Sequence, residues 1–359
     1  MALSSCWKGQ LNSFRLPKYI LPEEALQQLP ETLLLDVRTP AEYAESHIPG
    51  ARNLPLFDDD ERAEIGTLYK QVDPRTALLK GLELVGPKMR PLVEQTDEWA
   101  AGGCVMVHCW RGGQRSGSVA WLLEMSGYEV QVVKGGYKAY RRFVQDRLAA
   151  LALPLLVVGG PTGAGKTEVL YELAKRGEQV IDLEGLAHHK GSSFGALGEA
   201  PQPSVAAFEN RLYQQMSDLD LSRRVWIEDE SRMIGLVALP EGLFKQMQQA
   251  PVYLLEVSEE ARLDRLVEVY AGHDKDALAA AFQRIRKRLG GLRLQQAMQA
   301  LEREDYREAA RLALAYYDKA YRHHSEQKRP GQQKIALPLP SDSPSEIAEA
   351  LIQHANQKP

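Results

Sequence analysis

The sequence predicts an α/β protein with two domains, each built on a parallel β-sheet. The chain has 359 residues, which suits two domains of ordinary size. In both halves, short runs of apolar, often β-branched residues alternate with segments of helical character, and this alternation is typical of βαβ units. We expect the first domain at residues 1–150 and the second at residues 151–359, the latter ending in a helical, basic region.

The first domain opens with a short apolar run at residues 33–38, which predicts a buried strand. Thr39 and Pro40 follow and predict the start of a helix, with a capping side chain and a first-turn proline. The other elements expected here are a helical region at 58–99 broken at Pro74, Pro87 and Pro91, a strand that ends at Cys109, a helix at 116–125, a strand at 129–133 and a helix from Gly135 to about Leu151.

The segment around Cys109 carries the clearest chemistry. A β-branched apolar run ends in this cysteine, and two glycines, Arg115 and Ser116 follow. The glycines let several backbone N–H groups face one point, where Arg111, Arg115 and the next helix N-terminus favour an anion. Such surroundings lower the pKa of a thiol from its usual ~8.5. We interpret Cys109 as a thiolate nucleophile in an anion-binding loop; a buried cysteine at a strand end is the alternative.

The second domain opens with a strand at residues 155–158, and residues 160–167 complete the P-loop pattern behind it. Backbone N–H groups of such a loop cradle a di- or triphosphate, Lys166 would contact the terminal phosphates, and Thr167 would ligate Mg²⁺. A chance glycine-rich turn is the alternative. Further elements expected are a helix at 168–175, strands at 179–182, 225–228 and 252–257, a helical region at 258–324 and a last helix at 345–354. The expected diphosphate-binding residues are Gly160, Gly163, Gly165, Lys166, Thr167, Asp229 and Arg232.

An acidic residue should follow a second strand beside the P-loop. The best candidates end the strand at 225–228, where Asp229 or Glu228 could hold the metal through water. Arg232 could contact a phosphate or pair with Glu230. A solvated acidic turn is the alternative.

A polar loop at residues 182–195 also follows a predicted strand, at the edge of the sheet where ligands of open α/β folds bind. The adjacent His188 and His189 could donate protons or contact phosphate, but they are weak evidence for a metal. A plain surface loop is the alternative. The candidate substrate-binding residues are Asp182, Glu184, His189, Lys190, Ser192 and Ser193.

The densest basic run lies in the helical C-terminal region, with aromatic residues nearby at 316–321. Cations interleaved with aromatic rings suit RNA phosphates and stacked bases, although basic helix faces are often merely solvated. The candidate RNA-binding residues are Arg284, Arg286, Lys287, Arg288 and Arg293.

Composition narrows the class of protein. A net charge of −4 gives no global attraction to nucleic acid, so an RNA partner would need a local basic face. No apolar run approaches the ~20 residues that span a bilayer, and we expect no membrane contact. The three cysteines, Cys6, Cys104 and Cys109, cannot build a disulfide framework, so we expect a reducing, cytoplasmic setting.

The first half resembles a rhodanese domain, a family that passes sulfur or selenium on a cysteine. The resemblance rests on residues 35–38, 42–43 and 47–53 and on the Cys109 loop. The loop departs from the usual sulfurtransferase by one residue. Its spacing, Cys109-x5-Arg115, is that of cysteine phosphatases, some of which share the rhodanese fold. Loop length therefore leaves phosphatase chemistry open.

The combination with the second half is more specific. A rhodanese domain fused to a P-loop domain that carries motifs at 182–185, 189–195, 208–210 and 228–232 resembles the tRNA 2-selenouridine synthase family over nearly the whole chain. The resemblance implies action on 2-thiouridine at the wobble position of tRNA. That base would first be S-geranylated with geranyl diphosphate, and selenium from selenophosphate would then replace the geranylthio group.

The resemblance also implies roles for the site residues. Cys109 would attack selenium and expel phosphate, with Arg111 and Arg115 holding the phosphoryl oxygens. Lys166 and Thr167 with Mg²⁺ would stabilise the diphosphate leaving group. We expect no tightly bound cofactor, Mg²⁺ as an optional one, and the anticodon loop of tRNA as the partner. Cys6 and Cys104 are expected to be inert; resolution of a selenyl sulfide by either one is the alternative.

Two other functions remain open from the residues alone. One is a cysteine phosphatase fused to a nucleotide kinase-like domain, in which Cys109 would release phosphate from a phosphomonoester. The other is a nucleotide-switched RNA-binding module in which the basic C-terminal helices bind RNA and Cys109 has no role.

Overall fold

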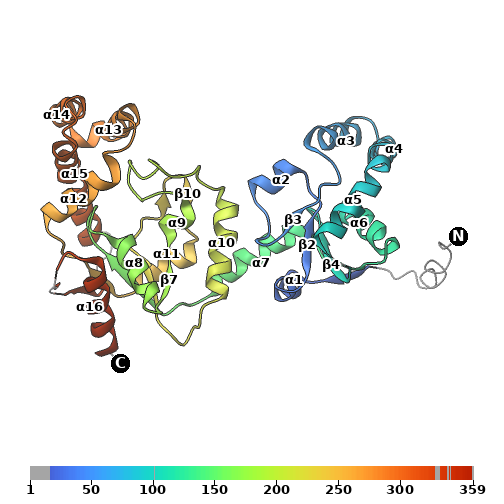
Figure 1. Ribbon diagram of the computed structural model, residues 1–359, viewed down its shortest axis with the longest axis horizontal. Coiled ribbons are helices and arrows are strands. Elements are labelled where there is room, and N and C mark those ends of the chain that lie inside the picture. The colour runs from blue at the N-terminus through green and yellow to red at the C-terminus, as the bar shows by residue number, and fades with distance from the viewer. Residues whose placement is uncertain (1–16, 101, 328–331, 338, 340, 358–359) are drawn as a thin grey trace. The chain divides into compact units, whose positions relative to one another are not determined.

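The computed structural model describes residues 17–100, 102–327, 332–337, 339 and 341–357. It divides into two compact units, Met1–Asp146 and Arg147–Pro359 (Figure 1). Cys6 lies outside the described residues. Both units are built on a parallel five-stranded sheet with helices, so the α/β class and the order of the two folds are confirmed.

The sheet of the first unit has the strand order β1-β5-β4-β2-β3, and all its pairs are parallel. The central strand β4 carries the apolar run before Cys109, and its last four residues are buried. The loop that follows β4 therefore starts from the middle of the sheet's carboxyl edge. The strands are β1 (Lys18–Ile20), β2 (Leu33–Asp36), β3 (Arg52–Asn53), β4 (Cys104–His108) and β5 (Glu129–Val133).

The elements of this unit follow the sequence expectations except at Pro91 and at the N-terminal β1 and α1. Pro91 does not interrupt a helix, because it is the third residue of α5, where backbone N–H groups have no intrahelical acceptor to lose. The strand β1 and helix α1 were not expected. The helices are α1 (Pro22–Gln28), α2 (Pro40–Glu45), α3 (Asp59–Gln71), α4 (Pro74–Val85), α5 (Met89–Trp99), α6 (Gln114–Met125) and α7 (Gly136–Ala150), with a 3₁₀ turn η1 (Gly86–Lys88).

The second unit has the strand order β12-β11-β6-β8-β7, again with parallel pairs. The P-loop follows the central strand β6, and the acidic segment follows its neighbour β8. These two segments therefore meet at one edge of the sheet. The strands are β6 (Leu155–Gly159), β7 (Gln179–Ile181), β8 (Val225–Glu228), β11 (Val252–Leu254) and β12 (Lys334–Ala336), and a separate hairpin pairs β9 (Met233–Ile234) with β10 (Val237–Ala238).

Six elements of this unit, α9, α10, α11, β9, β10 and β12, were not expected from the sequence, and α9 lies within the segment expected to be a loop. The helical region after residue 258 forms four helices, and α13, α14 and α15 share an apolar core that includes Phe194 of the loop after α9. The helices are α8 (Lys166–Lys175), α9 (Leu183–Ala187), α10 (Val205–Ser217), α11 (Glu241–Gln249), α12 (Glu259–Tyr270), α13 (Lys275–Leu289), α14 (Gly291–Glu302), α15 (Tyr306–Gln327) and α16 (Pro344–Gln357). Among the described residues, no helix is long and apolar enough to cross a membrane.

Candidate functional site

The Cys109 loop curls tightly because of two glycines with positive φ. Gly112 has φ +64°, and a Cβ there would lie 2.8 Å from the Val133 carbonyl oxygen. Gly136, at the start of α7, has φ +58°, and its Cβ would lie 2.2 Å from the Cys109 carbonyl oxygen. Only glycine allows the backbone to approach this closely. The loop is thus clamped between β5 and α7, with its amides turned inward.

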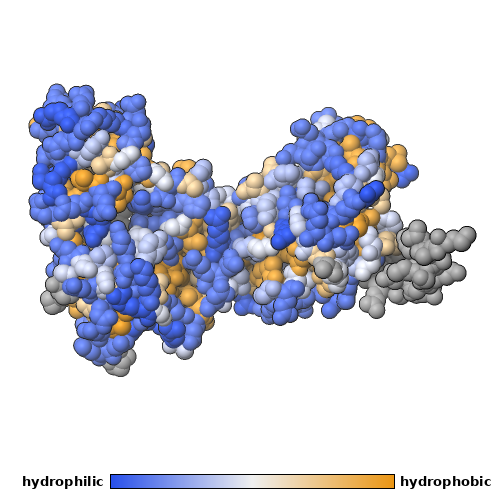
Figure 2. Space-filling model, viewed as in Figure 1, coloured by the Kyte–Doolittle hydropathy of each residue, from blue (hydrophilic) through white to orange (hydrophobic). Residues whose placement is uncertain are grey.

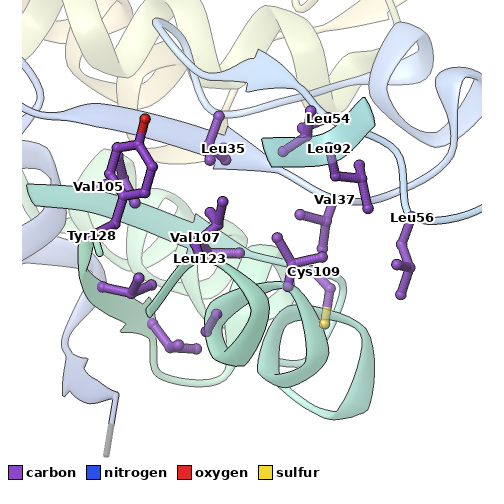
Figure 3. Close-up of a cluster of buried hydrophobic side chains, with 14 of the residues drawn as sticks. Leu35, Val37, Leu54, Leu56, Leu92, Val105, Val107, Cys109, Leu123 and Tyr128 are labelled. Carbon is purple, nitrogen blue, oxygen red and sulfur yellow. The ribbon is translucent and has the colours of Figure 1, made fainter. Parts of the chain in front are cut away.

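The Cys109 side chain is 4% exposed and has two different sides. One side packs in the apolar core of the first unit, where Figure 3 draws it with Val37, Leu56 and Leu123. On the other side, Sγ lies 3.3 Å from Ser116 Oγ and accepts a 3.4 Å hydrogen bond from the Gly113 N–H. The sulfur is therefore not enclosed by hydrocarbon alone.

These contacts set the protonation of the thiol. Burial by itself would raise the pKa of Cys109, but hydrogen bonds from Ser116 and from the backbone N–H groups of Arg111 and Gly113 outweigh it and lower the pKa below its ordinary value. Hydrogen bonds to the charged form are one of the recognised causes of such a shift. The structure thus supports the interpretation of Cys109 as a thiolate.

We expect Ser116→Ala to raise the pKa of Cys109, because it removes the largest of the contacts that favour the thiolate. A hydrogen bond to a charged group contributes ~1.5–3 kcal/mol, which corresponds to a shift of about one pH unit or more. The rate of alkylation by iodoacetamide, followed against pH, measures this, with Ser118→Ala on the exposed side of α6 as the control. An unchanged profile in Ser116→Ala would mean that the loop amides alone set the pKa.

The two loop arginines, which were expected to hold phosphoryl oxygens together, have different surroundings in the structure. Arg115 makes a two-pronged ion pair with Glu42 of α2, with Nη1–Oε2 at 2.6 Å and Nη2–Oε1 at 3.2 Å. The side chain of Arg111 is exposed, and its recorded contribution to the thiol comes from its backbone N–H. An anion entering the loop therefore meets amides first, and Arg115 is held in place by a carboxylate.

A buried polar layer supports the loop from behind. Asp36 and Arg38 form a fully buried ion pair with Oδ2–Nη2 at 2.6 Å, and the Arg38 guanidinium lies 3.9 Å from the ring centre of Tyr137. The Tyr137 N–H donates to the Cys109 carbonyl oxygen at 2.8 Å. His108 Nε2 lies 3.6 Å from Asp36 Oδ2, and burial lowers the pKa of this histidine. A neutral His108 and a satisfied ion pair keep the end of β4 rigid.

Cys104 stands apart from this chemistry. It begins β4, so it lies about 16 Å from Cys109 along the strand. Its Sγ accepts a 3.4 Å hydrogen bond from Gln131, and burial raises its pKa. Both features suit the inert role expected for it.

In the second unit, Lys166 of the P-loop is surrounded by carboxyl groups from other segments. Burial alone would lower the pKa of Lys166, but the nearby carboxylates of Glu184, Glu230, Asp229 and Glu228 raise it above its ordinary value. Lys166 is therefore a fixed cation at the start of α8. The structure brings Lys166, Asp229 and Glu184 together as the sequence predicted.

Thr167, predicted as the Mg²⁺ ligand, donates a 2.9 Å hydrogen bond to Glu184 Oε2. Hydroxyl and carboxylate oxygens are ligands that Mg²⁺ prefers. Among the described residues, however, no three His, Cys, Asp or Glu side chains are arranged to hold a metal ion. A Mg²⁺ ion at Thr167 would therefore depend on phosphate oxygens of the ligand.

Two of the acids behind the P-loop, Glu228 and Glu230, have raised pKa values. Glu228 is fully buried, its Oε1 accepts a 2.7 Å hydrogen bond from the Glu184 N–H, and burial raises its pKa well above the ordinary value. Burial and the neighbouring Glu184 do the same for Glu230. These two carboxyl groups therefore take up a proton more readily than an exposed glutamate does.

The predicted substrate loop divides into binding and structural residues. Glu184 faces the P-loop, whereas Asp182 caps α9 through the Gly185 N–H at 2.7 Å. Lys190 pairs with Glu199 at 3.0 Å. His189 is buried, burial lowers its pKa, and its Nδ1 finds no hydrogen-bond partner among the described residues. Asp182 and Lys190 therefore have structural partners that the sequence pattern does not reveal.

The basic residues of α13 and α14 are all exposed, and Figure 2 shows a largely hydrophilic surface at this end of the second unit. Two of them hold neighbouring segments. Arg284 donates to the Ser193 carbonyl oxygen at 2.6 Å, and Arg288 donates to the Tyr316 hydroxyl at 3.2 Å. Arg284, which was predicted from the sequence to bind RNA, therefore supports the loop after α9. Arg286, Lys287 and Arg293 remain solvated candidates.

Arg232 is also exposed, and its charge lowers the pKa of Glu241 at the start of α11. Among the described residues no ion pair joins Arg232 to Glu230, and the phosphate contact of Arg232 stays a prediction.

Comparisons with known proteins fit this pair of sites. Residues 153–358 match the family model for the tRNA 2-selenouridine synthase AAA domain, and residues 21–143 match the rhodanese-like domain. A tRNA 2-selenouridine synthase of Alcanivorax borkumensis is 39% identical over 331 residues, which cover 82% of this chain and 89% of that protein. This chain belongs to the tRNA 2-selenouridine synthase family. The resemblance expected from the sequence motifs is confirmed.

Solved structures similar to this family member match its parts. The N-terminal domain of a Clostridium difficile 630 protein described as ATP/GTP binding is 41% identical, with a TM-score of 0.33, and covers 35% of this chain and 98% of that one. A yeast protein tyrosine phosphatase of the rhodanese family is 20% identical, with a TM-score of 0.25, and covers 37% and 90%.

Sequence reasoning missed two arginines of α12 in this family member. Arg262 Nε donates to the Thr162 carbonyl oxygen at 2.9 Å and pairs with Asp318 of α15. Arg265 Nη1 donates to the Gly163 carbonyl oxygen at 2.7 Å, and its guanidinium lies against Gly165. No local pattern could reveal them, because they act across about 100 positions of sequence. They add positive charge to the rim of the P-loop.

Proposed function

We propose that this chain is a tRNA-modifying transferase that converts wobble 2-thiouridine to 2-selenouridine. The observation that carries the proposal is a thiol of lowered pKa in an amide-lined loop, within a chain whose family also supplies a P-loop. Each loop suits one anionic co-substrate. The P-loop suits geranyl diphosphate, and the Cys109 loop suits selenophosphate.

In the first step, the sulfur of 2-thiouridine attacks C1 of geranyl diphosphate, and the C–O bond to the diphosphate breaks. Lys166, a fixed cation, and the P-loop amides stabilise the leaving diphosphate. Mg²⁺ bound at Thr167 would add charge stabilisation to the same group. The Arg265 guanidinium, which lies against Gly165 of the P-loop, would add positive charge beside the leaving diphosphate.

In the second step, selenium replaces the geranylthio group at C2 of the base. Selenium leaves selenophosphate and arrives on the base as selenide, so the exchange needs no oxidant. Attack by Cys109 on selenium would leave phosphorus as phosphite. We therefore place the attack of the thiolate at phosphorus, so that the P–Se bond breaks and selenide is released. Selenide displaces geranylthiolate from C2, and water hydrolyses the phosphocysteine to phosphate.

The loop geometry is compatible with a phosphoryl group on Cys109. The spacing from Cys109 to Arg115 is the one found in cysteine phosphatases, and the loop amides already point at Sγ. Arg115 has five N–H donors, of which the pair with Glu42 uses two. The remaining donors suit phosphoryl oxygens.

Nucleoside analysis of tRNA containing 2-thiouridine, incubated with the protein, geranyl diphosphate and selenophosphate, tests the proposal. We expect S-geranylated 2-thiouridine with geranyl diphosphate alone and 2-selenouridine when selenophosphate is added. Release of phosphate from p-nitrophenyl phosphate, lost in Cys109→Ser, together with no change in the base, would instead favour a cysteine phosphatase. Binding of tRNA with neither activity would favour an RNA-binding module.

A further inference from the structure

An apolar cavity lies inside the second unit, between the loop after α9 and helices α12, α13, α14 and α15. Its volume, measured for the centres of water-sized molecules, is about 50 Å³. Side chains from each of these segments line it, including Phe194, Leu266, Phe282, Ala313 and Tyr317. All of them belong to one unit, so the cavity does not depend on how the two units are arranged.

The cavity adjoins the P-loop directly. Thr162, a P-loop residue, is part of its lining. Helix α12 packs on the same loop, because a Cβ on Gly163 would lie 3.3 Å from Leu266 and 3.4 Å from Arg262. Arg262, Leu266 and Tyr270 are spaced four residues apart and so share one face of α12. On this face of α12, Arg262 contacts the P-loop, and Leu266 and Tyr270 line the apolar cavity.

Two tyrosine hydroxyls of the cavity lining already have hydrogen-bond partners. The Tyr317 hydroxyl accepts a 3.1 Å hydrogen bond from the Ser193 N–H, and the Tyr270 hydroxyl interacts with Ser192. Burial raises the pKa of Tyr270 to about 12, so it stays neutral. The rings of Phe194 and Phe282 meet edge to face at 4.9 Å. A ligand in the cavity therefore meets carbon and ring faces.

We propose that this cavity binds the terminal isoprene unit of a prenyl diphosphate and limits the length of the chain that the protein accepts. The inference rests on the proposed function, since it names where the hydrocarbon part of that substrate lies. A nucleoside would bury hydrogen-bonding groups against an apolar wall, which is costly. A hydrocarbon chain attached to a diphosphate matches both the charged P-loop and its apolar neighbour.

The size of the cavity supports a limit on chain length. One water needs about 10–15 Å³ on the same measure, so the cavity holds roughly four such groups, close to the five carbons of an isoprene unit. The first isoprene unit of geranyl diphosphate would then bridge the P-loop and the cavity mouth near Thr162, and the second would fill the cavity. A third unit would require Phe282 or Tyr317 to move.

The test compares dimethylallyl, geranyl and farnesyl diphosphates as donors to tRNA containing 2-thiouridine. Ala313→Leu places a larger side chain in the cavity, and Ala315→Leu, on the exposed side of the same helix, is the matched control. We expect Ala313→Leu to lower kcat/KM for geranyl diphosphate by at least about 10-fold while dimethylallyl transfer is retained, since one methylene in an apolar pocket is worth ~10–200-fold. Ala315→Leu should behave as wild type.

A second variant tests the opposite direction. Phe282→Ala enlarges the cavity and should raise the ratio of farnesyl to geranyl transfer by about 10-fold. Transfer from dimethylallyl diphosphate, which needs the P-loop but not the cavity, reports whether the second unit of each variant is folded.

The outcomes separate the two proposals. If the wild-type protein transfers no prenyl group from any donor, the proposed function fails. If it transfers geranyl but Ala313→Leu and Phe282→Ala leave the order of the three donors unchanged, the cavity does not hold the chain and this inference fails. Protection of the cavity variants and the wild type by ATP alone in a thermal shift would point to a nucleoside site.

Discussion

Cys109→Ser should form S-geranylated tRNA at the wild-type rate and no detectable 2-selenouridine. The serine hydroxyl keeps the size of the side chain and its contact with Ser116, but it is not ionised at neutral pH and attacks poorly. We expect selenation to fall by at least about 100-fold, as is usual when a catalytic nucleophile is lost. Geranylation should persist, because the diphosphate site lies in the other unit. Mass spectrometry of nucleosides from treated tRNA measures both products.

Cys104→Ser is the matched control for this experiment. Cys104 begins the same strand, is half-buried and has a raised pKa, so its replacement should leave both products unchanged. Phosphorus-32 in the selenophosphate gives a further readout, since wild-type protein quenched in acid should carry labelled phosphate at residue 109. If Cys109→Ser loses both products, the two steps are not divided between the units. If the label is instead released as phosphite and never appears on the protein, selenium itself is the atom that Cys109 attacks.

The sequence predicted those parts of the fold that local patterns determine. The segments at 225–228 and 129–133 form strands with those bounds, because each is short, contains β-branched residues and is followed by a charged residue. The P-loop and the Cys109 loop were found for the same reason, since their glycines lie next to the residues that act. Helix α10 was missed although its buried Phe208, Leu212 and Met216 recur every four residues, a spacing that indicates one apolar helix face.

The chemistry around each loop could not be predicted in the same way. Glu42 reaches Arg115 from 73 positions away, and Arg262 reaches Thr162 from 100. Such contacts cannot be predicted from sequence spacing, because they depend on how α2 and α12 pack. The same holds for Arg284, whose basic neighbours suggest RNA but whose guanidinium holds Ser193. Local motifs therefore predicted the candidate reacting residues. The charged side chains that surround them are determined by tertiary packing and were not predicted.

Lys166→Ala should abolish accumulation of S-geranylated tRNA while leaving the second step intact. Lys166 is a buried cation among the acids behind the P-loop, and in the proposed mechanism its loss removes a fixed charge that stabilises the leaving diphosphate. Loss of one preorganised donor of this kind costs ~10²–10³ in rate, and we expect geranylation to fall by about that factor. The protein should still convert tRNA that has been geranylated beforehand to 2-selenouridine. Lys175→Ala, at the exposed end of the same helix, is the control.

The fold should survive the loss of Lys166 because its acidic neighbours can take up protons. Burial already holds the pKa of Glu228 and Glu230 well above the ordinary value, and Lys166 is the charge that lowers that of Glu230. Without the lysine, the pKa of Glu230 rises further, so the acid becomes neutral and does not remain as a buried charge. The variant should therefore lose less stability at pH 6 than at pH 8, which thermal unfolding measures. Equal losses at both pH values would mean that the acids stay charged, and geranylation would then have to be compared at matched folded fractions.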